Sequence, residues 1–222
     1  MKRPYGLFDM DGTLLDSMPF WMSLDHSYLV THGLEYTEEI QRVTEKLRLR
    51  DVLAWYHEEL GLGDSPESMV IDCFAIMLRH YTQDIKVKEG VIPYLDALQA
   101  AGVKMAVVTA SPLVLAVPAL ERHGLEKYFA EIISIDDVGV SKTEPVIYDE
   151  ALRLLGGSSR EEAVVYEDAT YSLRTAYQAG YFTVLVDDAF YLPSRKEALL
   201  YARHHVKFLE AAEALKIHGA LD

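Results

Sequence analysis

Two aspartates near the amino terminus carry more chemical information than any other residues of this sequence. Asp9 and Asp11 follow the apolar run 5–8 and precede Gly12. Because side chains alternate along a strand, both carboxylates should lean to one side at the strand end, where the glycine allows a sharp turn. Two crowded carboxylates repel each other unless a divalent cation lies between them or one of them is protonated. Both states are useful in catalysis, and the pattern indicates phosphoryl transfer through an aspartyl intermediate.

The elements that must position these aspartates can be read from the rest of the chain. Short β-branched runs at 103–108, 131–134, 163–166 and 182–186 alternate with helical stretches. This alternation predicts right-handed crossovers and a parallel sheet flanked by helices. Residues 16–85, by contrast, have a helical pattern throughout. We therefore predict an α/β fold with a Rossmann-like parallel sheet in a discontinuous core, residues 1–15 and 86–222, and an inserted all-helical cap, residues 16–85.

Further polar residues follow the predicted strands and should meet the two aspartates at one edge of the sheet. In open parallel sheets, ligands bind outside the carboxyl ends of the strands, near the point where strand order reverses. Thr109 and Ala110 follow one strand, Lys142 follows the next after a loop, and Glu167 and Asp168 end another. The helical insert leaves the core at the same edge, and we expect it to cover the site as a lid.

Composition and charge narrow the class of protein. The 222 residues have a formal net charge of −14, which argues against nucleic-acid and anionic-membrane partners, although a local cation can still hold a phosphorylated metabolite. The single cysteine, Cys73, excludes a disulfide framework and lies in an apolar helical stretch, where we expect a buried thiol. No secretory or membrane segment is indicated, and we expect a cytoplasmic protein. The oligomeric state is unknown, with a monomer favoured.

The motifs together resemble those of the haloacid dehalogenase-like superfamily, within it the β-phosphoglucomutase-like phosphatases with a small helical cap. The resemblance covers nearly the whole chain. Its four motifs are Asp-x-Asp-Gly-Thr at 9–13, a threonine ending an apolar strand at Thr109, a lysine before a helix at Lys142, and an acidic pair at 167–168. Two departures are that 141–143 read Ser-Lys-Thr where the family usually has Gly-Lys-Pro, and that Ala169 and Ser172 replace a serine and a glycine.

The resemblance implies a role for each motif. Asp9 would be the nucleophile, and Asp11 the general acid and base. Mg²⁺ would be held by Asp9, the main-chain carbonyl of Asp11 and Asp168, with Glu167 binding it directly or through an intervening group. The phosphate would be bound by Lys142, Thr109 and the main-chain N–H groups around Asp11 and Ala110.

The helical insert is expected to select the substrate, because the core contacts only the phosphate. The candidate residues are Trp21 and a basic cluster formed by Lys46, Arg48 and Arg50. If the cluster faces the site, it favours a substrate with a second anionic group. The alternative is that the tryptophan packs the insert and the basic residues are surface charges.

We predict a Mg²⁺-dependent phosphomonoester hydrolase that acts on a small phosphorylated metabolite such as a sugar phosphate. One alternative is a phosphosugar mutase, whose lid excludes water so that the phosphoryl group returns to the sugar. Trp21 stands near the position where such mutases have a histidine, which favours hydrolysis. The other alternative is a catalytically silent module that binds a phosphometabolite or has a regulatory role. Outside the motifs, Asp187 and Asp188 are expected to form a solvated turn, with a minor role near the metal as the alternative. His204 and His205 are expected to form a surface pair.

Overall fold

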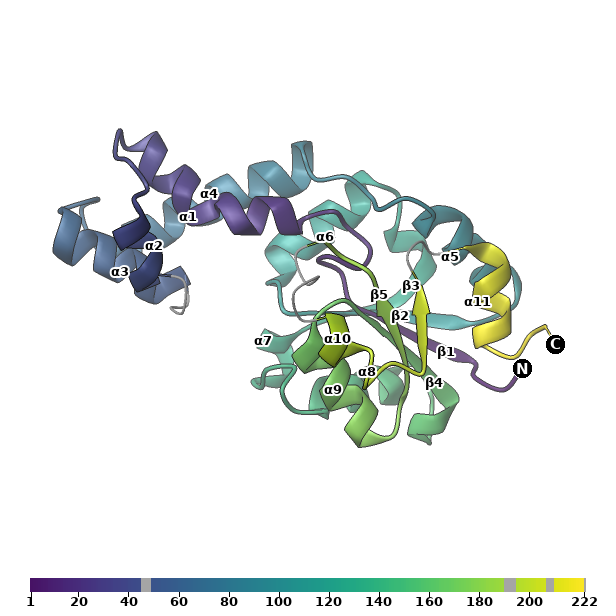
Figure 1. Cartoon of the computed structure of the whole chain (residues 1–222). Coiled ribbons are helices and arrows are strands. Elements are labelled where there is room, and N and C mark those ends of the chain that lie inside the picture. The colour runs from purple at the N-terminus through teal and green to yellow at the C-terminus, as the bar shows by residue number, and fades with distance from the viewer. Residues whose placement is uncertain (45–48, 190–194, 207–209, 222) are drawn as a thin grey trace. The chain divides into compact units, whose positions relative to one another are not determined.

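In the part of the chain that the structure describes, a six-stranded parallel sheet forms the centre of the larger of two units. The computed structural model describes residues 1–44, 49–189, 195–206 and 210–221. The unit that contains the sheet comprises Met1–Met18 and Ile85–Asp222, and the other comprises Pro19–Asp84 (Figure 1). We call them the core unit and the helical unit.

The strand order of the sheet reverses next to its first strand. The strands are β1 (Tyr5–Phe8), β2 (Lys104–Thr109), β3 (Phe129–Ser134), β4 (Ala163–Glu167), β5 (Phe182–Val186) and β6 (His204–Val206). Their order in space is β3-β2-β1-β4-β5-β6, so β1 lies between β2 and β4. The predicted α/β fold is confirmed. The sequence did not predict β6, because this strand has three residues and two of them are histidines.

Helices cover both faces of the sheet, which explains why its strands are apolar on both sides. The helices of the core unit are α5 (Val91–Ala100), α6 (Leu113–Arg122), α7 (Ile135–Val138), α8 (Val146–Leu154), α9 (Thr170–Ala179), α10 (Arg195–Ala198) and α11 (Ala211–Ile217). Leu7 and Val165 face one side and pack with Leu152 of α8 and Ala176 of α9. On the other side, the ring of Tyr166 contacts Tyr94 of α5 and His218 after α11.

The helical unit consists of α1 (Met18–Thr31), α2 (Glu38–Thr44), α3 (Leu49–Leu60) and α4 (Pro66–Gln83). The start of α4 follows from its sequence, because the Ser65 hydroxyl accepts a hydrogen bond from Ser68 N at 3.1 Å and Pro66 occupies the first turn. Cys73 lies on the buried face of α4, and burial raises the pKa of its thiol to about 12. The expected buried thiol is therefore confirmed. The position of this unit as a lid stays a prediction.

Backbone hydrogen bonds join the two segments by which the core unit connects to the helical unit. Asp16 N donates to Lys86 O at 2.9 Å, and Lys88 N donates to Leu14 O at 2.9 Å. Between these bonds, Leu15 pairs with Val87 in an antiparallel bridge. The outgoing and returning segments are thus held side by side within the core unit.

Among the described residues, none of the helices combines the length and apolar character that crossing a bilayer requires.

Candidate active site

A buried lysine lies between two buried carboxylates at the carboxyl ends of β1 and β4. Lys142 Nζ donates to Asp9 Oδ1 at 2.5 Å and to Glu167 Oε1 at 2.8 Å. The exposed fractions are 2% for Lys142, 6% for Asp9 and 1% for Glu167. Asp9 follows β1, Glu167 ends β4, and Lys142 lies in the loop between α7 and α8. Charges buried this deeply are tolerated only when they are paired and hydrogen-bonded, so the three side chains fix one another.

The charges of this group shift one another's pKa values. Burial lowers the pKa of Lys142, but the neighbouring carboxylates of Asp9 and Glu167 outweigh burial and raise it, so the lysine stays protonated. Burial raises the pKa of Asp9 against the opposing charge of Lys142, and the nearby charge of Asp11 raises it further. Burial also raises the pKa of Glu167, to about 7. The group therefore has more carboxylates than the lysine can neutralise.

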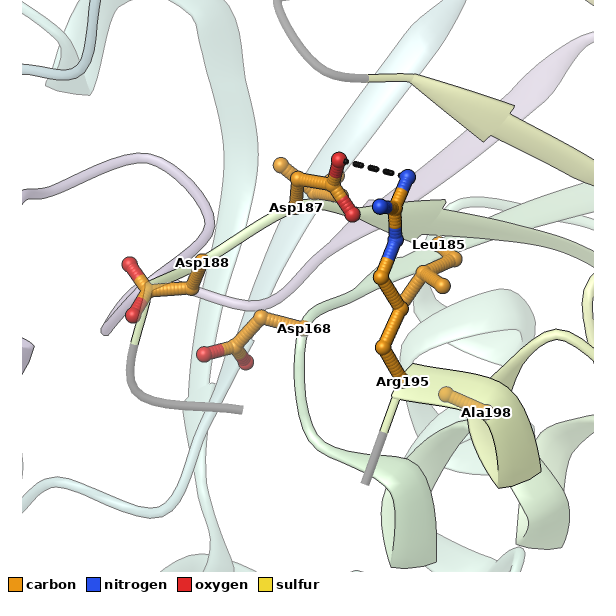
Figure 2. Close-up of a pocket in the computed structure, with 7 residues that line it drawn as sticks. Asp168, Leu185, Asp187, Asp188, Arg195 and Ala198 are labelled. Carbon is orange, nitrogen blue, oxygen red and sulfur yellow. Dashed lines mark ion pairs between the residues drawn. The ribbon is translucent and has the colours of Figure 1, made fainter. Parts of the chain in front are cut away.

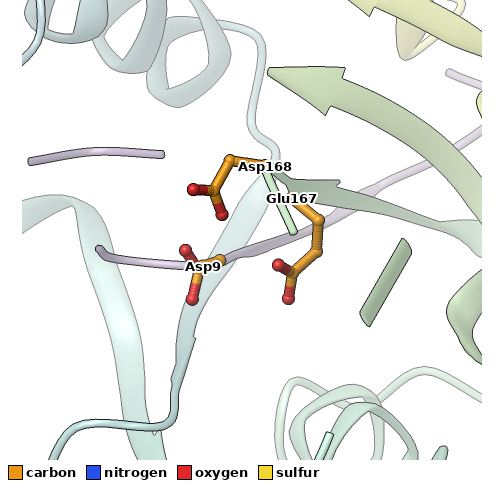
Figure 3. Close-up of side chains that lie close together, drawn as sticks. All are labelled: Asp9, Glu167 and Asp168. Atoms are coloured by element: carbon orange, nitrogen blue, oxygen red, sulfur yellow. The ribbon is translucent and has the colours of Figure 1, made fainter. Parts of the chain in front are cut away.

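One carboxylate oxygen from each of Asp9, Glu167 and Asp168 lies within 4.8 Å of the other two (Figure 3). Asp9 Oδ2 and Asp168 Oδ2 are buried and have no hydrogen-bond partner among the described residues. Leaving such oxygens unpaired is costly, and oxygen ligands of this kind are those that a divalent cation such as Mg²⁺ prefers. Gly12, with φ of 79°, passes so close to Asp168 that any side chain would collide with it. The donor set fits a divalent cation.

The carboxylate of Asp11 is held by two serine hydroxyls. Ser17 Oγ donates to Asp11 Oδ1 at 2.7 Å, and Ser111 Oγ donates to Asp11 Oδ2 at 2.6 Å. Ser17 precedes α1 and is buried, and Ser111 follows the end of β2. Sequence reasoning gave neither serine a role. Their positions in the sequence could have indicated a role, because Ser17 follows the segment of Asp11 and Ser111 follows Thr109.

The predicted phosphate-binding residues of β2 lie at the same sheet edge. Thr109 ends β2 and is buried, and its Oγ1 accepts a hydrogen bond from Ser111 N at 2.9 Å. Ala110 lies between them and is exposed. The threonine hydroxyl therefore shapes the turn that brings Ser111 to Asp11.

Tyr148 of α8 was also missed by the sequence reasoning, and its hydroxyl donates to Glu167 Oε1 at 2.7 Å.

The predicted specificity residues belong to the helical unit. Trp21 Nε1 donates to the hydroxyl of Tyr81 at 2.9 Å, so the indole is hydrogen-bonded inside this unit. Arg50 is exposed on α3. Lys46 and Arg48 lie outside the described residues. The role of these four residues in substrate selection stays a prediction.

The expectation of a solvated turn at Asp187 and Asp188 is wrong. Their side chains are 15% and 5% exposed, because basic residues pair with both. Asp187 contacts Arg195 at 3.1 Å and His205 Nε2 at 2.8 Å. In Figure 2, Asp187 points toward Arg195, whereas the side chain of Asp188 points away from Arg195, in the same direction as the carboxylate of Asp168. The two strand-end aspartates therefore extend the charged edge of the sheet beyond Asp168.

The two histidines expected as a surface pair are half-buried on β6. His204 contacts Glu213 at 2.6 Å, and His205 contacts Asp187. Their side chains therefore have different partners, as the alternation of a strand requires.

Comparison with known proteins gives the family of this chain. The family model described as haloacid dehalogenase-like hydrolase matches residues 7–186. A phosphorylated carbohydrates phosphatase of Thermotoga maritima is 30% identical over 78% of this chain and 80% of its own. A phosphoglycolate phosphatase of Mesorhizobium japonicum is 30% identical over 100% of this chain and 94% of its own.

A solved structure extends the comparison to the fold. A Thermotoga maritima protein, provisionally described as a β-phosphoglucomutase, superposes with a TM-score of 0.81 and 28% identity, covering 98% of this chain and 99% of its own. The chain belongs to the haloacid dehalogenase-like hydrolase family. The prediction that it is a phosphatase of this family is confirmed by the match to the family and by the phosphatases among its relatives.

Proposed function

We propose that the chain is a Mg²⁺-dependent phosphomonoester hydrolase for a small phosphorylated metabolite of the sugar-phosphate kind, with Asp9 as nucleophile. The observation that carries the proposal is the asymmetry of the Asp9 carboxylate. Lys142 holds Oδ1 at 2.5 Å, whereas Oδ2 is buried without a hydrogen-bond partner among the described residues. Because the lysine fixes the carboxylate through one oxygen, the whole group keeps a constant direction, as attack on phosphorus and binding of a cation both require.

In the first step, an oxygen of Asp9 attacks the phosphorus of the bound monoester. An oxygen–phosphorus bond to Asp9 forms while the bond from phosphorus to the leaving oxygen breaks. Asp11, protonated at this stage, gives its proton to the leaving oxygen, and the alcohol departs. The acyl phosphate on Asp9 divides one difficult displacement into two easier ones.

In the second step, Asp11 is a carboxylate and takes a proton from a water molecule. The water oxygen attacks the phosphorus, the bond to Asp9 breaks, and inorganic phosphate is released with both aspartates restored. Ser17 and Ser111 hold the two oxygens of Asp11 at 2.7 and 2.6 Å, which supports its proposed position for proton transfer.

Mg²⁺ would be held by Asp9, Asp168 and the main-chain carbonyl of Asp11, with Glu167 close by, and would offset the negative charge of the transferring group. Lys142 contributes a fixed positive charge beside the nucleophile. Burial of the group keeps water from weakening these electrostatic interactions. The names of two relatives, a phosphorylated carbohydrates phosphatase and a phosphoglycolate phosphatase, support the substrate class.

The test is phosphate release from a panel of phosphorylated metabolites and from p-nitrophenyl phosphate, with Mg²⁺ or with EDTA. We expect Mg²⁺-dependent release that Asp11→Asn lowers by roughly 10²- to 10⁴-fold, the usual worth of an acid–base group. Asp9→Asn should abolish both turnover and labelling of the chain by phosphorylated substrate. Asp136→Asn, at an exposed aspartate of α7, is the matched control and should keep full activity. Turnover that survives in Asp9→Asn would contradict the proposal.

A phosphosugar mutase is the second candidate, and the whole-chain similarity to the solved structure from Thermotoga maritima favours it. Isomer formation and phosphate release should be measured on the same sugar phosphate, with and without a bisphosphate activator. Isomer with little free phosphate would favour the mutase over the hydrolase. Mg²⁺-dependent turnover of either kind would exclude a catalytically silent binding module.

A further inference from the structure

Lys88 joins three segments of the core unit beside the candidate metal site. Its Nζ donates to Gly12 O at 2.5 Å, to Asp187 O at 2.9 Å and to Asp188 Oδ2 at 3.0 Å. The lysine side chain is 16% exposed, and that of Asp188 is 5% exposed. All three ammonium hydrogens therefore have an acceptor, and the acceptors come from the turn after β1 and from the end of β5.

The bond from Lys88 to Gly12 fixes the turn that carries Asp11. The peptide unit before the Gly12 Cα contains the Asp11 carbonyl and Gly12 N, and Gly12 N donates to Leu15 O at 2.9 Å. The peptide unit after it contains Gly12 O, which accepts from Lys88. Because peptide units are planar, hydrogen bonds on both sides of the Gly12 Cα define the direction of the Asp11 carbonyl. A glycine with φ of 79° would otherwise leave this direction free to change.

The same lysine also fixes the acidic edge on the other side of the turn. Asp188 and Asp168 point to the same side of the sheet edge in Figure 2, and the Gly12 backbone lies against Asp168. Burial raises the pKa of Asp168, the neighbouring carboxylates, that of Asp188 among them, raise it further, and the positive charge of Lys88 opposes them. Lys88 thus pairs with Asp188 at the edge of the sheet where the Gly12 backbone lies against Asp168.

We propose that Lys88 is a positioning residue of the candidate active site, which holds the Gly12 turn and the end of β5 so that the carboxylates are arranged to bind a divalent cation. The proposal rests on the proposed metal-dependent function. Lys88 lies on the segment through which the chain returns from the helical unit to the core unit. By this proposal, the returning segment contributes to the geometry of the metal site.

The direction in which cation affinity changes when Lys88 is removed distinguishes a positioning role from a purely electrostatic one. A lysine that acts only through its charge repels a cation, so its removal should tighten cation binding. A lysine that holds the ligands in place improves binding despite its charge, so its removal should weaken it. Partners of metal ligands typically change metal affinity by about 10- to 100-fold when they are removed.

The experiment measures Mn²⁺ binding directly, by titration calorimetry or electron paramagnetic resonance, in the full chain and in Lys88→Met. We expect the Mn²⁺ dissociation constant of Lys88→Met to rise at least about tenfold. The Mg²⁺ concentration for half-maximal hydrolysis of p-nitrophenyl phosphate should rise by a similar factor. Lys104→Met is the matched control and should bind Mn²⁺ as the parent chain does, because Lys104 is exposed at the amino end of β2.

Equal or tighter Mn²⁺ binding by folded Lys88→Met would overturn the proposal. Thermal unfolding without metal shows whether the variant is folded. If it is not folded, Lys88→Gln replaces it, since the glutamine amide retains hydrogen-bond donors. We expect the Mn²⁺ dissociation constant of Lys88→Gln to rise about threefold or more. Unchanged or tighter Mn²⁺ binding by this variant would overturn the proposal. A parent chain that binds Mn²⁺ but hydrolyses no phosphomonoester would contradict the proposed function and leave the comparison of Mn²⁺ affinities intact.

Discussion

Ser111 Oγ donates a hydrogen bond to Asp11 Oδ2 at 2.6 Å, and the two residues are 100 positions apart in the chain. Together with Ser17, which donates to the other oxygen, this contact holds the carboxylate from two sides. Two hydrogen bonds to the two oxygens of one carboxylate restrict its rotation. The proposed acid–base residue is thus held by hydroxyl groups, whereas the proposed nucleophile is held by a lysine.

The first prediction concerns this contact. Ser111→Ala should lower kcat about tenfold, because a hydrogen bond to a charged group contributes roughly 1.5 kcal/mol or more. Steady-state kinetics on p-nitrophenyl phosphate with saturating Mg²⁺ measures the effect. Thr175→Ala serves as the control, because among the described residues the Thr175 hydroxyl bonds only to Tyr171 O of its own helix. A kcat within twofold of the parent value in Ser111→Ala would show that this contact does not position Asp11.

The second prediction concerns the stability contributed by the buried lysine. Lys142→Met leaves Asp9 and Glu167 buried without their common cation, so the free energy of unfolding should fall by about 3 kcal/mol or more. Urea denaturation in EDTA at neutral pH measures the change without a contribution from bound metal. Lys216→Met, at an exposed position of α11, should have little effect. A loss below about 1 kcal/mol would mean that the carboxylates are compensated without the lysine.

The third prediction concerns metal removal. A cation that binds only the folded chain stabilises it, by about 2.7 kcal/mol when its concentration is 100 times the dissociation constant. Addition of Mg²⁺ after EDTA treatment should therefore raise Tm. Asp168→Asn should lose most of this increase, because it removes a carboxylate with a buried oxygen that has no partner in the described part of the chain. The exposed Asp64→Asn should retain the increase, and an equal increase in both variants would place the cation elsewhere.

The fourth prediction concerns a buried histidine at the far face of the sheet. His218 Nδ1 donates to Arg3 O at 2.6 Å, while the Tyr166 hydroxyl lies 2.9 Å from His218 Nε2 and accepts from the Tyr94 hydroxyl at 2.9 Å. A carbonyl oxygen can only accept, so Nδ1 carries the proton of the neutral ring and Nε2 accepts from Tyr166. Burial lowers the pKa of His218 to about 4.

Stability should therefore decrease with acidification between pH 6.5 and 4. In this interval the unfolded chain binds a proton at His218 that the folded chain does not, so the contribution is complete above pH 6.5 and is lost as pH falls toward 4. The full contribution of His218 to the free energy of unfolding is about 3 kcal/mol. Urea denaturation of the parent and of His218→Gln from pH 7 to 4.5 measures it as a difference, which cancels the titration of other groups. A difference that does not change with pH would contradict the lowered pKa.

The parts of the fold that the sequence predicted are those with local signals. The strand 5–8 and the four later β-branched runs each have a pattern within a few residues, and the structure has a strand at each of them. Because parallel strands end at one edge, the meeting of Asp9, Lys142, Glu167 and Asp168 also followed from topology.

The parts that were missed depend on contacts between distant segments. No local pattern near Lys88 indicates that its ammonium group reaches Gly12 and Asp188, which are 76 and 100 positions away. Asp187 and Asp188 resemble a solvated turn in sequence, and only the fold places Lys88, Arg195 and His205 beside them. Side-chain pairing of this kind is set by the completed fold and not by neighbouring residues.

The antiparallel bridge between Leu15 and Val87 has a consequence for how such a chain can diversify. The two ends of the 19–84 segment are anchored to each other by the core unit, so that another segment could be grafted at this junction without moving the strand ends. Closure entropy hardly opposes such an exchange, because doubling the length of an inserted loop costs only about 0.6 kcal/mol. The segment between these anchors can therefore change in length and sequence while the strand ends that hold the carboxylates stay in place.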